Sequence, residues 1–244
     1  MNKYSLIIPC YNEEKNLPKL FSKFSNSFEN YKIEIIFVDN GSTDNTNYLL
    51  NEFSKKKKSV KIISVKKNVG YGHGILQGLN KSSGNFVGWT HADLQTNPED
   101  FIKAVELIEK NKGENMFVKG VRHGRNYFDM IFTLGMTLFE CILLRKWLSD
   151  INGQPTVFNK QLFLNWKNPP HDFSLDLYTF YHAKIKKYDI IRVPVFFGKR
   201  YSGVGSNDGL KAKIKYSFKT INYSFKIVFN NLRKRDVKNS SSYK

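Results

Sequence analysis

Four groups of polar residues, each placed directly after a short apolar run, are the part of the sequence best suited to chemistry. Each group mixes residue types that bind ligands, namely carboxylates, amides and glycines. Ligands of an open α/β sheet bind at the carboxyl ends of its strands, so these groups would meet at one rim if the apolar runs are parallel strands. One group alone would carry little weight, because Asp, Asn and Gly are also ordinary turn residues. The groups are Pro9–Glu13, Asp39–Asp44, Lys67–Gly74 and His91–Gln95.

The apolar runs have the composition of buried strands. They are short and rich in Ile, Val and Phe, as are strands covered on both faces. The centres of successive runs are separated by 29, 27 and 24 positions along the chain. Apolar residues at helical spacing lie between the runs. Strand–helix–strand units of this length form right-handed crossovers, which predicts an α/β sheet flanked by helices. The runs are Ser5–Pro9, Glu34–Val38, Val60–Val65 and Asn85–Thr90.

The second half of the chain predicts further elements at wider intervals. The apolar helix Phe128–Leu144 carries Asp129 and Glu140 and falls short of the ~20 apolar residues of a spanning helix, so no membrane span is predicted. The other predicted elements are the strands Met116–Lys119 and Ile190–Val195 and the helices Phe101–Ile108 and Asp176–Lys186.

The composition narrows the class of protein. Of the 244 residues, 41% are apolar, which is enough for a substantial core. Two cysteines, Cys10 and Cys141, exclude a disulfide framework and favour a reducing compartment. Met1–Glu14 lacks the pattern of a secretory signal peptide. The net charge of +18 calls for an acidic partner or surface.

Much of that charge lies near the carboxyl end. Lys199–Lys244 holds 12 basic and 2 acidic residues. A basic amphipathic helix can lie on an anionic membrane surface, and the alternative is that its apolar stripe packs on the preceding domain. We therefore expect a domain over residues 1–205 and, over 206–244, this helix followed by disorder from Asp236. The stripe consists of Leu210, Ile214, Phe218, Ile221, Phe225, Val228 and Leu232.

Nucleic acid is a second acidic partner to consider. Tyrosines and phenylalanines alternate with lysines over Lys215–Lys226, and such aromatics can stack on single-stranded bases. The same aromatics fall on the apolar stripe, so burial explains them better and no nucleic-acid partner is expected.

The polar groups, in this order, resemble glycosyltransferase family 2, most closely its polyprenyl-phosphate (dolichol-phosphate) hexosyltransferase branch. The resemblance covers about the first 205 residues and implies the GT-A fold, a Rossmann-like, mixed and mostly parallel sheet flanked by helices. A weaker match later in the chain joins Arg192–Val195 to Lys199–Gly203. The main matching residues are Ile8–Glu13, Val38–Asp44, Asn68–Gly72, Ala92–Gln95 and Pro98–Glu99.

The resemblance implies a nucleotide-sugar site. Asp39 would accept a hydrogen bond from the base, since an ionised carboxylate is acceptor-only. Gly70 and Gly72 would let the backbone approach the ligand closely. The implied nucleotide-sugar-binding residues are Pro9, Tyr11, Glu13, Asp39, Gly41, Asn68, Gly70, Gly72, His91 and Ala92.

The resemblance also implies a divalent cation, Mg²⁺ or Mn²⁺, held by Asp93 with Gln95 and bridging the donor's diphosphate. The sequence departs from the family pattern here. His91-Ala92-Asp93 replaces Asp-x-Asp, and Asp39-Asn40-Gly41 replaces Asp-Asp-Gly. Imidazole suits Mn²⁺ better than Mg²⁺. Three roles therefore stay open for His91: metal ligation, orientation of a phosphate, or filling space.

The acceptor site implied by the resemblance is basic. Arg122, Arg125, Lys199 and Arg200 are the candidates to bind an acceptor phosphate. A phosphate nucleophile needs no base, whereas a sugar hydroxyl needs a nearby carboxylate, for which Asp172 and Asp176 are candidates. The polar turn Asp150–Pro155 could border the acceptor site, and a tight structural turn is the favoured interpretation. The predicted catalytic residues are Asp93, Arg122, Arg200, Asp172 and Asp176.

The sequence thus predicts an inverting transfer of a hexose from a nucleotide sugar to a membrane-associated acceptor such as a polyprenyl phosphate. The enzyme would be cytoplasmic and peripheral at the inner face of an anionic membrane, and would act in glycan or glycolipid biosynthesis. One alternative is transfer to a sugar hydroxyl of a growing polysaccharide. Another is an inactive nucleotide-sugar-binding protein, because His91 and Asn40 stand where the family has carboxylates.

Overall fold

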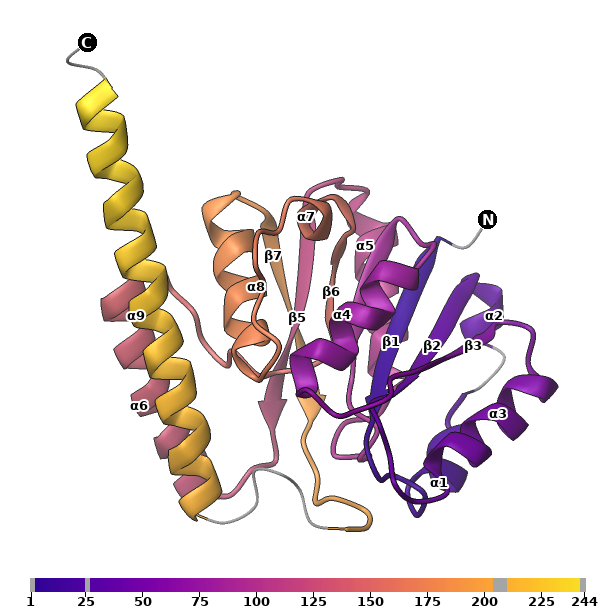
Figure 1. Cartoon of the computed structure of the whole chain (residues 1–244). Coiled ribbons are helices and arrows are strands. Elements are labelled where there is room, and N and C mark those ends of the chain that lie inside the picture. Colours follow the sequence, from indigo (N-terminus) through magenta and orange to yellow (C-terminus); the bar gives the residue numbers. More distant parts are fainter. Residues whose placement is uncertain (1–2, 25–26, 204–209, 242–244) are drawn as a thin grey trace.

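A computed structural model describes residues 3–24, 27–203 and 210–241, with side chains in the last range described only at 214–215 and 217–230. Within these residues, seven strands form one mixed sheet in the order β3-β2-β1-β4-β6-β5-β7 (Figure 1). The strands are β1 Tyr4–Cys10, β2 Ile33–Asp39, β3 Val60–Ser64, β4 Phe86–Trp89, β5 Met116–His123, β6 Thr156–Asn159 and β7 Asp189–Phe196. The helices are α1 Leu17–Phe21, α2 Ser27–Asn30, α3 Thr46–Lys56, α4 Tyr71–Lys81, α5 Asp100–Asn111, α6 Tyr127–Leu144, α7 Gln161–Leu164, α8 Ser174–Ile185 and α9 Leu210–Ser241.

The central strands β1, β2 and β4 are buried on both faces, which is why they are mostly apolar. Side chains alternate between the faces, so Leu6 and Ile8 pack with α1 and α5 while Ile7 packs with α4 and α8. Two hydrophobic cores result, one on each side of the sheet. The predicted α/β class, with a mostly parallel sheet flanked by helices, is confirmed.

The strand directions bring the polar groups to one edge of the sheet. β1 runs parallel to both β2 and β4, and β5 runs parallel to β7. β6 lies between β4 and β5 and is antiparallel to both, so those two strands also share a direction. The carboxyl ends of these strands therefore form one rim, toward which the arrowheads of β5 and β7 point at the lower edge of Figure 1.

Strand β6 was not predicted from the sequence. It has only four residues and follows a polar turn, so local alternation gives no sign of it. The strand is defined by its neighbours instead, since Phe158 pairs with Val87 on one side and Phe117 on the other. Strand preference of this kind arises from tertiary packing rather than from local sequence.

Helix α9 lies beside α6 (Figure 1), where Ser224 contacts Glu140 and the rings of Phe225 and Phe139 meet edge to face. Among the α9 side chains that the structure describes, Ser224 and Ile227 are buried. Three residues of the predicted apolar stripe, Ile214, Phe218 and Phe225, are instead exposed, at 42%, 61% and 41%. The predicted stripe is an apolar face of α9, but the residues of α9 that the neighbouring helices cover lie on a different part of the helix surface.

The end of α9 also differs from expectation. The helix continues to Ser241, past the predicted start of disorder at Asp236. The sequence from residue 210 onward contains no Gly or Pro that would break it. The predicted domain boundary at residues 205–206 lies outside the described residues and stays a prediction.

Helix α6 has an unusual surface for the edge of a folded domain. Only 17% of its 18 residues are buried, and the exposed ones include Phe128, Leu134 and Ile142. Among the described residues, α6 is long enough and apolar enough to cross a membrane, by length and composition alone. At ~1.5 Å per residue it is about 27 Å long, slightly less than the ~30 Å hydrocarbon core of a bilayer.

Candidate active site

Asp39 and Asp93 lie on the same rim, on either side of β1. Asp39 ends β2 and is paired with Cys10, and Asp93 follows β4, whose Trp89 is paired with Ile7. Two strand spacings separate β2 from β4, about 10 Å. Glu13, in the loop after β1, lies between them along this edge. The loops expected to clasp a ligand are therefore neighbours.

The loops after β1 and β2 are joined by hydrogen bonds. Asn12 Oδ1 accepts the backbone N–H of Thr43 at 2.8 Å, and Thr46 Oγ1 accepts that of Glu13 at 2.8 Å. The Asp39 carboxylate accepts the N–H of Ser42 at 3.0 Å and the amide of Asn47 at 2.8 Å. Asp39 is thereby fixed in its own turn. Tyr11 is exposed at the rim and Pro9 is half-buried beside it.

The glycines of the site pack closely against neighbouring backbone, while their expected approach to a ligand stays a prediction. A Cβ on Gly70 would lie 2.4 Å from the His171 carbonyl oxygen, and one on Gly72 would lie 2.7 Å from that of Asp172. Gly41 has φ +77° and packs against the backbone of Asn68. Closely packed loops therefore require these glycines.

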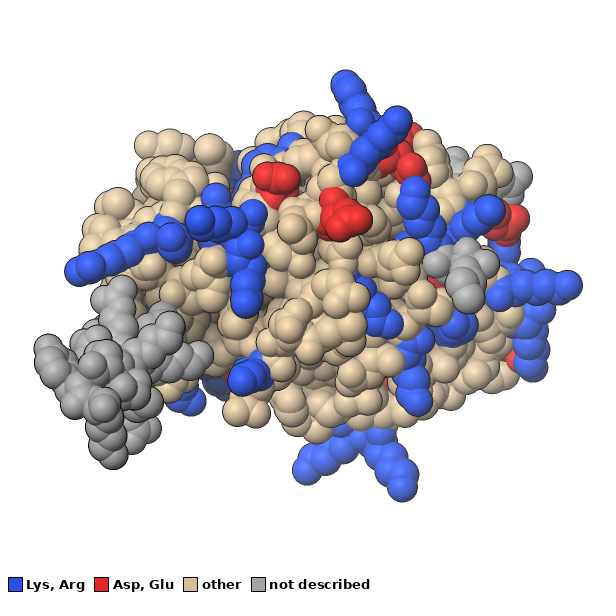
Figure 2. Space-filling view, turned by 90° about the horizontal axis from the view of Figure 1, so that it is seen from above, with Lys and Arg blue, Asp and Glu red and all other residues tan. Residues whose placement is uncertain are grey.

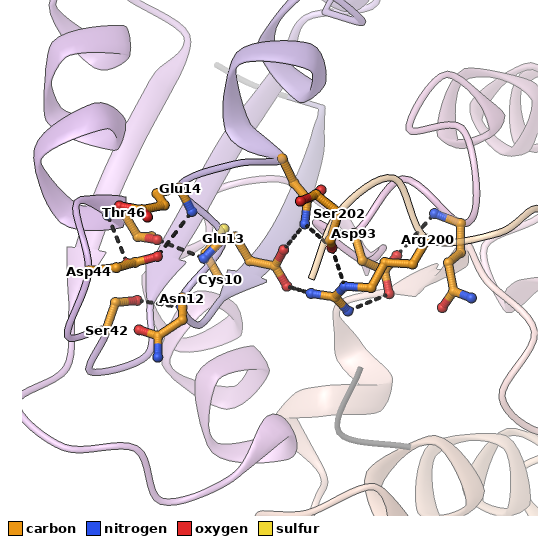
Figure 3. Close-up of polar contacts among 12 residues, drawn as sticks. Cys10, Asn12, Glu13, Glu14, Ser42, Asp44, Thr46, Asp93, Arg200 and Ser202 are labelled. Atoms are coloured by element: carbon orange, nitrogen blue, oxygen red, sulfur yellow. Dashed lines mark hydrogen bonds and ion pairs between the residues drawn. The ribbon is translucent and has the colours of Figure 1, made fainter. Parts of the chain in front are cut away.

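Asp93 is held in a compact polar cluster, shown in Figure 3. Its Oδ1 accepts the N–H of Gln95 at 3.1 Å, and its Oδ2 lies 3.3 Å from Nη1 of Arg200. The other guanidinium nitrogen, Nη2, bonds Oε1 of Glu13. Burial raises the pKa of Glu13, although Asn16 and Arg200 both donate to its carboxylate and oppose that rise. The structure thus brings Glu13, Asp93 and Arg200 together.

His91 and Ala92 precede this cluster. The imidazole of His91 stacks on the ring of Tyr71 at 5.5 Å, and Tyr71 stacks on Phe173 at 4.6 Å. Ala92 is buried in the core. An aromatic stack therefore positions His91, while its predicted contact with metal or phosphate stays a prediction.

The donor set at Asp93 fits a hard cation that is shared with another ligand. A guanidinium already rests on Oδ2, so the position favours positive charge. Among the described residues, no group of three or more His, Cys, Asp and Glu side chains could hold a metal by itself. Asp93 and the Gln95 amide oxygen would need further oxygens, such as those of a diphosphate, to complete a coordination shell.

A second polar cluster surrounds Asp150. Arg122 contacts Asp150 through Nε at 2.8 Å and Nη2 at 2.6 Å, and Arg125 Nη2 lies 4.0 Å from the same oxygen. Burial alone would raise the pKa of Asp150, but the charge and hydrogen bonds of Arg122 hold it below its usual value. Two arginines share one carboxylate, so the cluster keeps a net positive charge at the rim.

The segment of residues 197–203, here called the Arg200 segment, runs from this basic cluster to Asp93. The Phe197 N–H donates to the His123 carbonyl at 2.9 Å, and the Phe197 ring lies 5.2 Å from the Arg122 guanidinium. The Gly198 N–H donates to the Gln95 carbonyl at 2.8 Å. Lys199 is exposed, beside a hollow of about 620 Å³ that Lys19, Lys23 and Lys103 also line.

The two predicted acceptor-side bases lie in different surroundings. Asp172 accepts the N–H of Ser174 at the start of α8. Asp176 is 2% exposed, lies 3.4 Å from the ammonium of Lys119 and accepts the indole N–H of Trp89. Asp176 is therefore buried in an ion pair, while the roles of Asp172 and Asp176 as bases stay predictions.

Lys119 is a residue that sequence reasoning missed, and Asp150 is one for which it favoured a purely structural turn. Lys119 lies in a buried strand, where a charge needs a partner; that conflict was the signal available in the sequence. Asp150 lies in a turn and differs in no visible way from other turn residues. Its role depends on Arg122, which lies 28 positions earlier in the chain.

The mixed sheet and its polar rim define a protein of the GT-A type. The family model described as "Glycosyl transferase family 2" matches residues 5–188, and the chain belongs to that family. The structural likeness extends to a mannosyltransferase from Pyrobaculum calidifontis, solved in complex with GDP-mannose and Mn²⁺. That protein is 20% identical with a TM-score of 0.61, over 83% of this chain and 58% of its own.

Two curated relatives share part of the sequence. A dolichol-phosphate mannosyltransferase from Pyrococcus furiosus is 29% identical over 208 residues, which cover 82% of this chain and 58% of the relative. An undecaprenyl-phosphate 4-deoxy-4-formamido-L-arabinose transferase from Proteus mirabilis is 35% identical over 113 residues, covering 45% of this chain and 35% of the relative. The matched part of the chain thus spans little more than half of the length of the first relative and about a third of the second.

Proposed function

We propose that this protein transfers a hexose from a nucleotide sugar to a polyprenyl phosphate, with inversion at the anomeric carbon, on the surface of a membrane. The observation that carries the proposal is the pair of arginines at Asp150, on the same rim as Asp93. The names of both relatives join a polyprenyl phosphate to the transfer of a sugar, which supports the proposal.

The basic cluster suits a phosphate acceptor. The guanidinium groups of Arg122 and Arg125 are largely buried, with side-chain exposures of 13% and 10%. Asp150 compensates only one of the two arginine charges, and a bound phosphate would supply the missing negative charge. The forked donors of arginine also match phosphate oxygens. Asp150 would then act as a positioning residue that aims Arg122.

The carboxylates favour the same acceptor. A sugar hydroxyl would need a base within hydrogen-bonding reach, and Asp176 is buried in an ion pair. Asp172 is the remaining predicted base, and one of its oxygens already accepts the Ser174 N–H. A phosphate oxygen is anionic and needs no proton removed.

The reaction is a single displacement. An acceptor phosphate oxygen attacks the anomeric carbon and forms the new C–O bond, while the bond from that carbon to the donor's diphosphate breaks. Arg200 stands at the donor side to neutralise charge on the departing nucleoside diphosphate. A divalent cation held by Asp93 and Gln95 would stabilise the same charge. The Pyrobaculum neighbour was solved with Mn²⁺, which supports testing that ion first.

Membrane association is proposed from the surface of α6 and α9. Phe128 and Leu134 of α6 and Phe218 and Phe229 of α9 are exposed, and Lys215, Lys219 and Lys226 of α9 are exposed beside them. Each basic side chain near an anionic surface contributes about 1 kcal/mol. On the face of the molecule seen from above in Figure 2, basic side chains lie around the edge and acidic side chains are fewer.

The decisive experiment is a transfer assay with the full chain. A panel of UDP-, GDP- and TDP-sugars would be combined with a short polyprenyl phosphate or with the matching polyprenyl alcohol, with and without Mn²⁺. We expect product only with the phosphate. Transfer to the alcohol or to an added oligosaccharide, but not to the phosphate, would refute the proposal, as would the absence of product with every donor.

Membrane binding is tested separately by flotation with phosphatidylglycerol vesicles. The double variant Phe218→Ser/Phe229→Ser should lose most of its retention. Tyr48→Ser, at a tyrosine of α3 as exposed as Phe229 (64%), is the matched control and should behave as the unaltered chain does. Equal retention of all three proteins, or salt-dependent retention on single-stranded nucleic acid in place of vesicles, would contradict the membrane assignment.

A further inference from the structure

The guanidinium of Arg200 joins two carboxylates that come from different strands. Figure 3 shows it between Glu13, in the loop after β1, and Asp93, after β4. Nη1 lies 3.3 Å from Asp93 Oδ2, and Nη2 bonds Glu13 Oε1. The side chains of Glu13 and Asp93 are only 10% and 11% exposed, so water has little access to their contacts with Arg200.

Several backbone contacts hold the Arg200 segment in this position. The Tyr201 N–H donates to the Asp93 carbonyl at 3.4 Å, and the Gly198 N–H donates to the Gln95 carbonyl at 2.8 Å. Arg200 Nε donates to the Ser202 carbonyl at 2.8 Å, which fixes the plane of the guanidinium. The segment is therefore docked directly on the residues predicted to bind the metal.

Arg200 and a divalent ion would compete for the same oxygen of Asp93. Oδ1 of Asp93 accepts the Gln95 N–H, so Oδ2 is the oxygen that a metal ion would use, and Arg200 occupies it. A divalent ion on Oδ2 would meet the guanidinium at close range, where repulsion in a half-buried site is strong. Without Arg200, the two carboxylates would be left with uncompensated negative charge.

We propose that Arg200 is a tethered counter-cation that competes with the divalent ion for Asp93. Glu13 keeps Arg200 nearby, whether Arg200 or the divalent ion is bound to Asp93. The metal then binds well only together with the donor's diphosphate, whose negative charge attracts the displaced guanidinium. This inference rests on the proposed metal-dependent function, and it makes the donor and its ion bind as a pair.

The test measures Mn²⁺ binding to the full chain without nucleotide, from the electron paramagnetic resonance signal of the free ion. Arg200→Gln should bind Mn²⁺ about tenfold or more tightly than the unaltered chain. Lys199→Gln is the matched control, because it removes the same charge from the next residue, whose side chain is exposed. It should leave the affinity for Mn²⁺ within about twofold, and adding Asp93→Asn to Arg200→Gln should abolish the gain.

A second measurement needs no variant and guards against misfolding of Arg200→Gln. The affinity of the unaltered chain for Mn²⁺ should rise at least tenfold, by about 1.4 kcal/mol, when UDP or GDP is added. Tight binding of Mn²⁺ without nucleotide, or equal affinities for the two glutamine variants, would overturn the competition. Failure of every variant to bind Mn²⁺ even with nucleotide would instead overturn the metal in the proposed function.

Discussion

Asp150 accepts three hydrogen bonds from the single residue Arg122: from its backbone N–H at 2.6 Å, from Nε at 2.8 Å and from Nη2 at 2.6 Å. The contact fixes both the end of β5 and the direction of the guanidinium. Arg125, whose other guanidinium nitrogen donates to Thr133, is aligned on the same carboxylate. One acidic side chain therefore orders the predicted acceptor site.

Asp150→Asn should weaken acceptor binding while sparing the donor. The amide keeps the shape of the carboxylate but removes the charge that holds two arginines together, so the arginines would repel and separate. We expect the KM for a short polyprenyl phosphate to rise about tenfold, which corresponds to ~1.4 kcal/mol. The affinity for the nucleotide, measured by calorimetry, should not change.

Asp189→Asn is the control for this prediction, because Asp189 is exposed and begins β7 at the opposite end from the rim. An equal change in KM for the two variants, or a change confined to the nucleotide affinity of Asp150→Asn, would show that Asp150 does not order an acceptor site.

The ion pair of Lys119 and Asp176 predicts a large effect on stability. Both side chains are buried, at 0% and 2% exposure, and burial lowers the pKa of Lys119 to about 8 although Asp176 opposes the shift. Lys119→Met would leave Asp176 charged and without its cation, which costs about 3–5 kcal/mol of unfolding free energy in urea. Adding Asp176→Leu should recover most of that loss, whereas a double variant as unstable as the single one would contradict the pairing.

The sequence was sufficient to place residues along the rim but not to pair them. Buried strands at regular spacing imply parallel β1, β2 and β4, and this alone brings Asp39 and Asp93 to one edge. The pairs that define the site join distant residues, 28 positions apart for Arg122 and Asp150 and 187 for Glu13 and Arg200. Local periodicity carries no information on such contacts, and the same limit explains why the sequence left two alternatives open for the apolar stripe of α9.

Glu34 predicts a loss of stability in acid. Burial alone would raise its pKa, but hydrogen bonds from Lys61, Ser5 and Ser83 lower it from 4.5 to about 2. The folded state therefore binds this proton less readily than the unfolded state. The stabilisation is complete above pH 4.5 and is lost as the pH falls toward 2.

Glu34→Gln should reduce the free energy of unfolding by about 2–3 kcal/mol at pH 7, and the difference from the unaltered chain should shrink near pH 2. Urea titrations at several pH values measure it. Glu52→Gln, which breaks an exposed pair with Lys55, is the control and should change stability by no more than about 0.5 kcal/mol. A constant Glu34→Gln difference from pH 7 to pH 2 would disprove the assigned cause.

Glu140 predicts the opposite dependence on pH. Its carboxylate is fully buried between α6 and α9, where Oε2 accepts the Ser224 hydroxyl at 2.5 Å. Oε1 has no hydrogen-bond partner among the described residues. Burial raises its pKa from 4.5 to about 7, although the Ser224 hydrogen bond opposes the shift. The folded state holds this proton more tightly than the unfolded state, so stability is greatest below pH 4.5 and falls as the pH rises through 7.

Glu140→Gln removes the charge and keeps a group that can bond Ser224. The variant should be more stable than the unaltered chain at pH 8, by about 1–3 kcal/mol, and should differ little from it at pH 4.5. Unfolding in urea at the two pH values measures this, with the exposed Glu114→Gln as control. Because Glu140 lies in the contact between the helices proposed to meet the membrane, a gain at pH 8 would show that its ionisation loosens α9 from α6. Parallel pH profiles for the two proteins would rule that out.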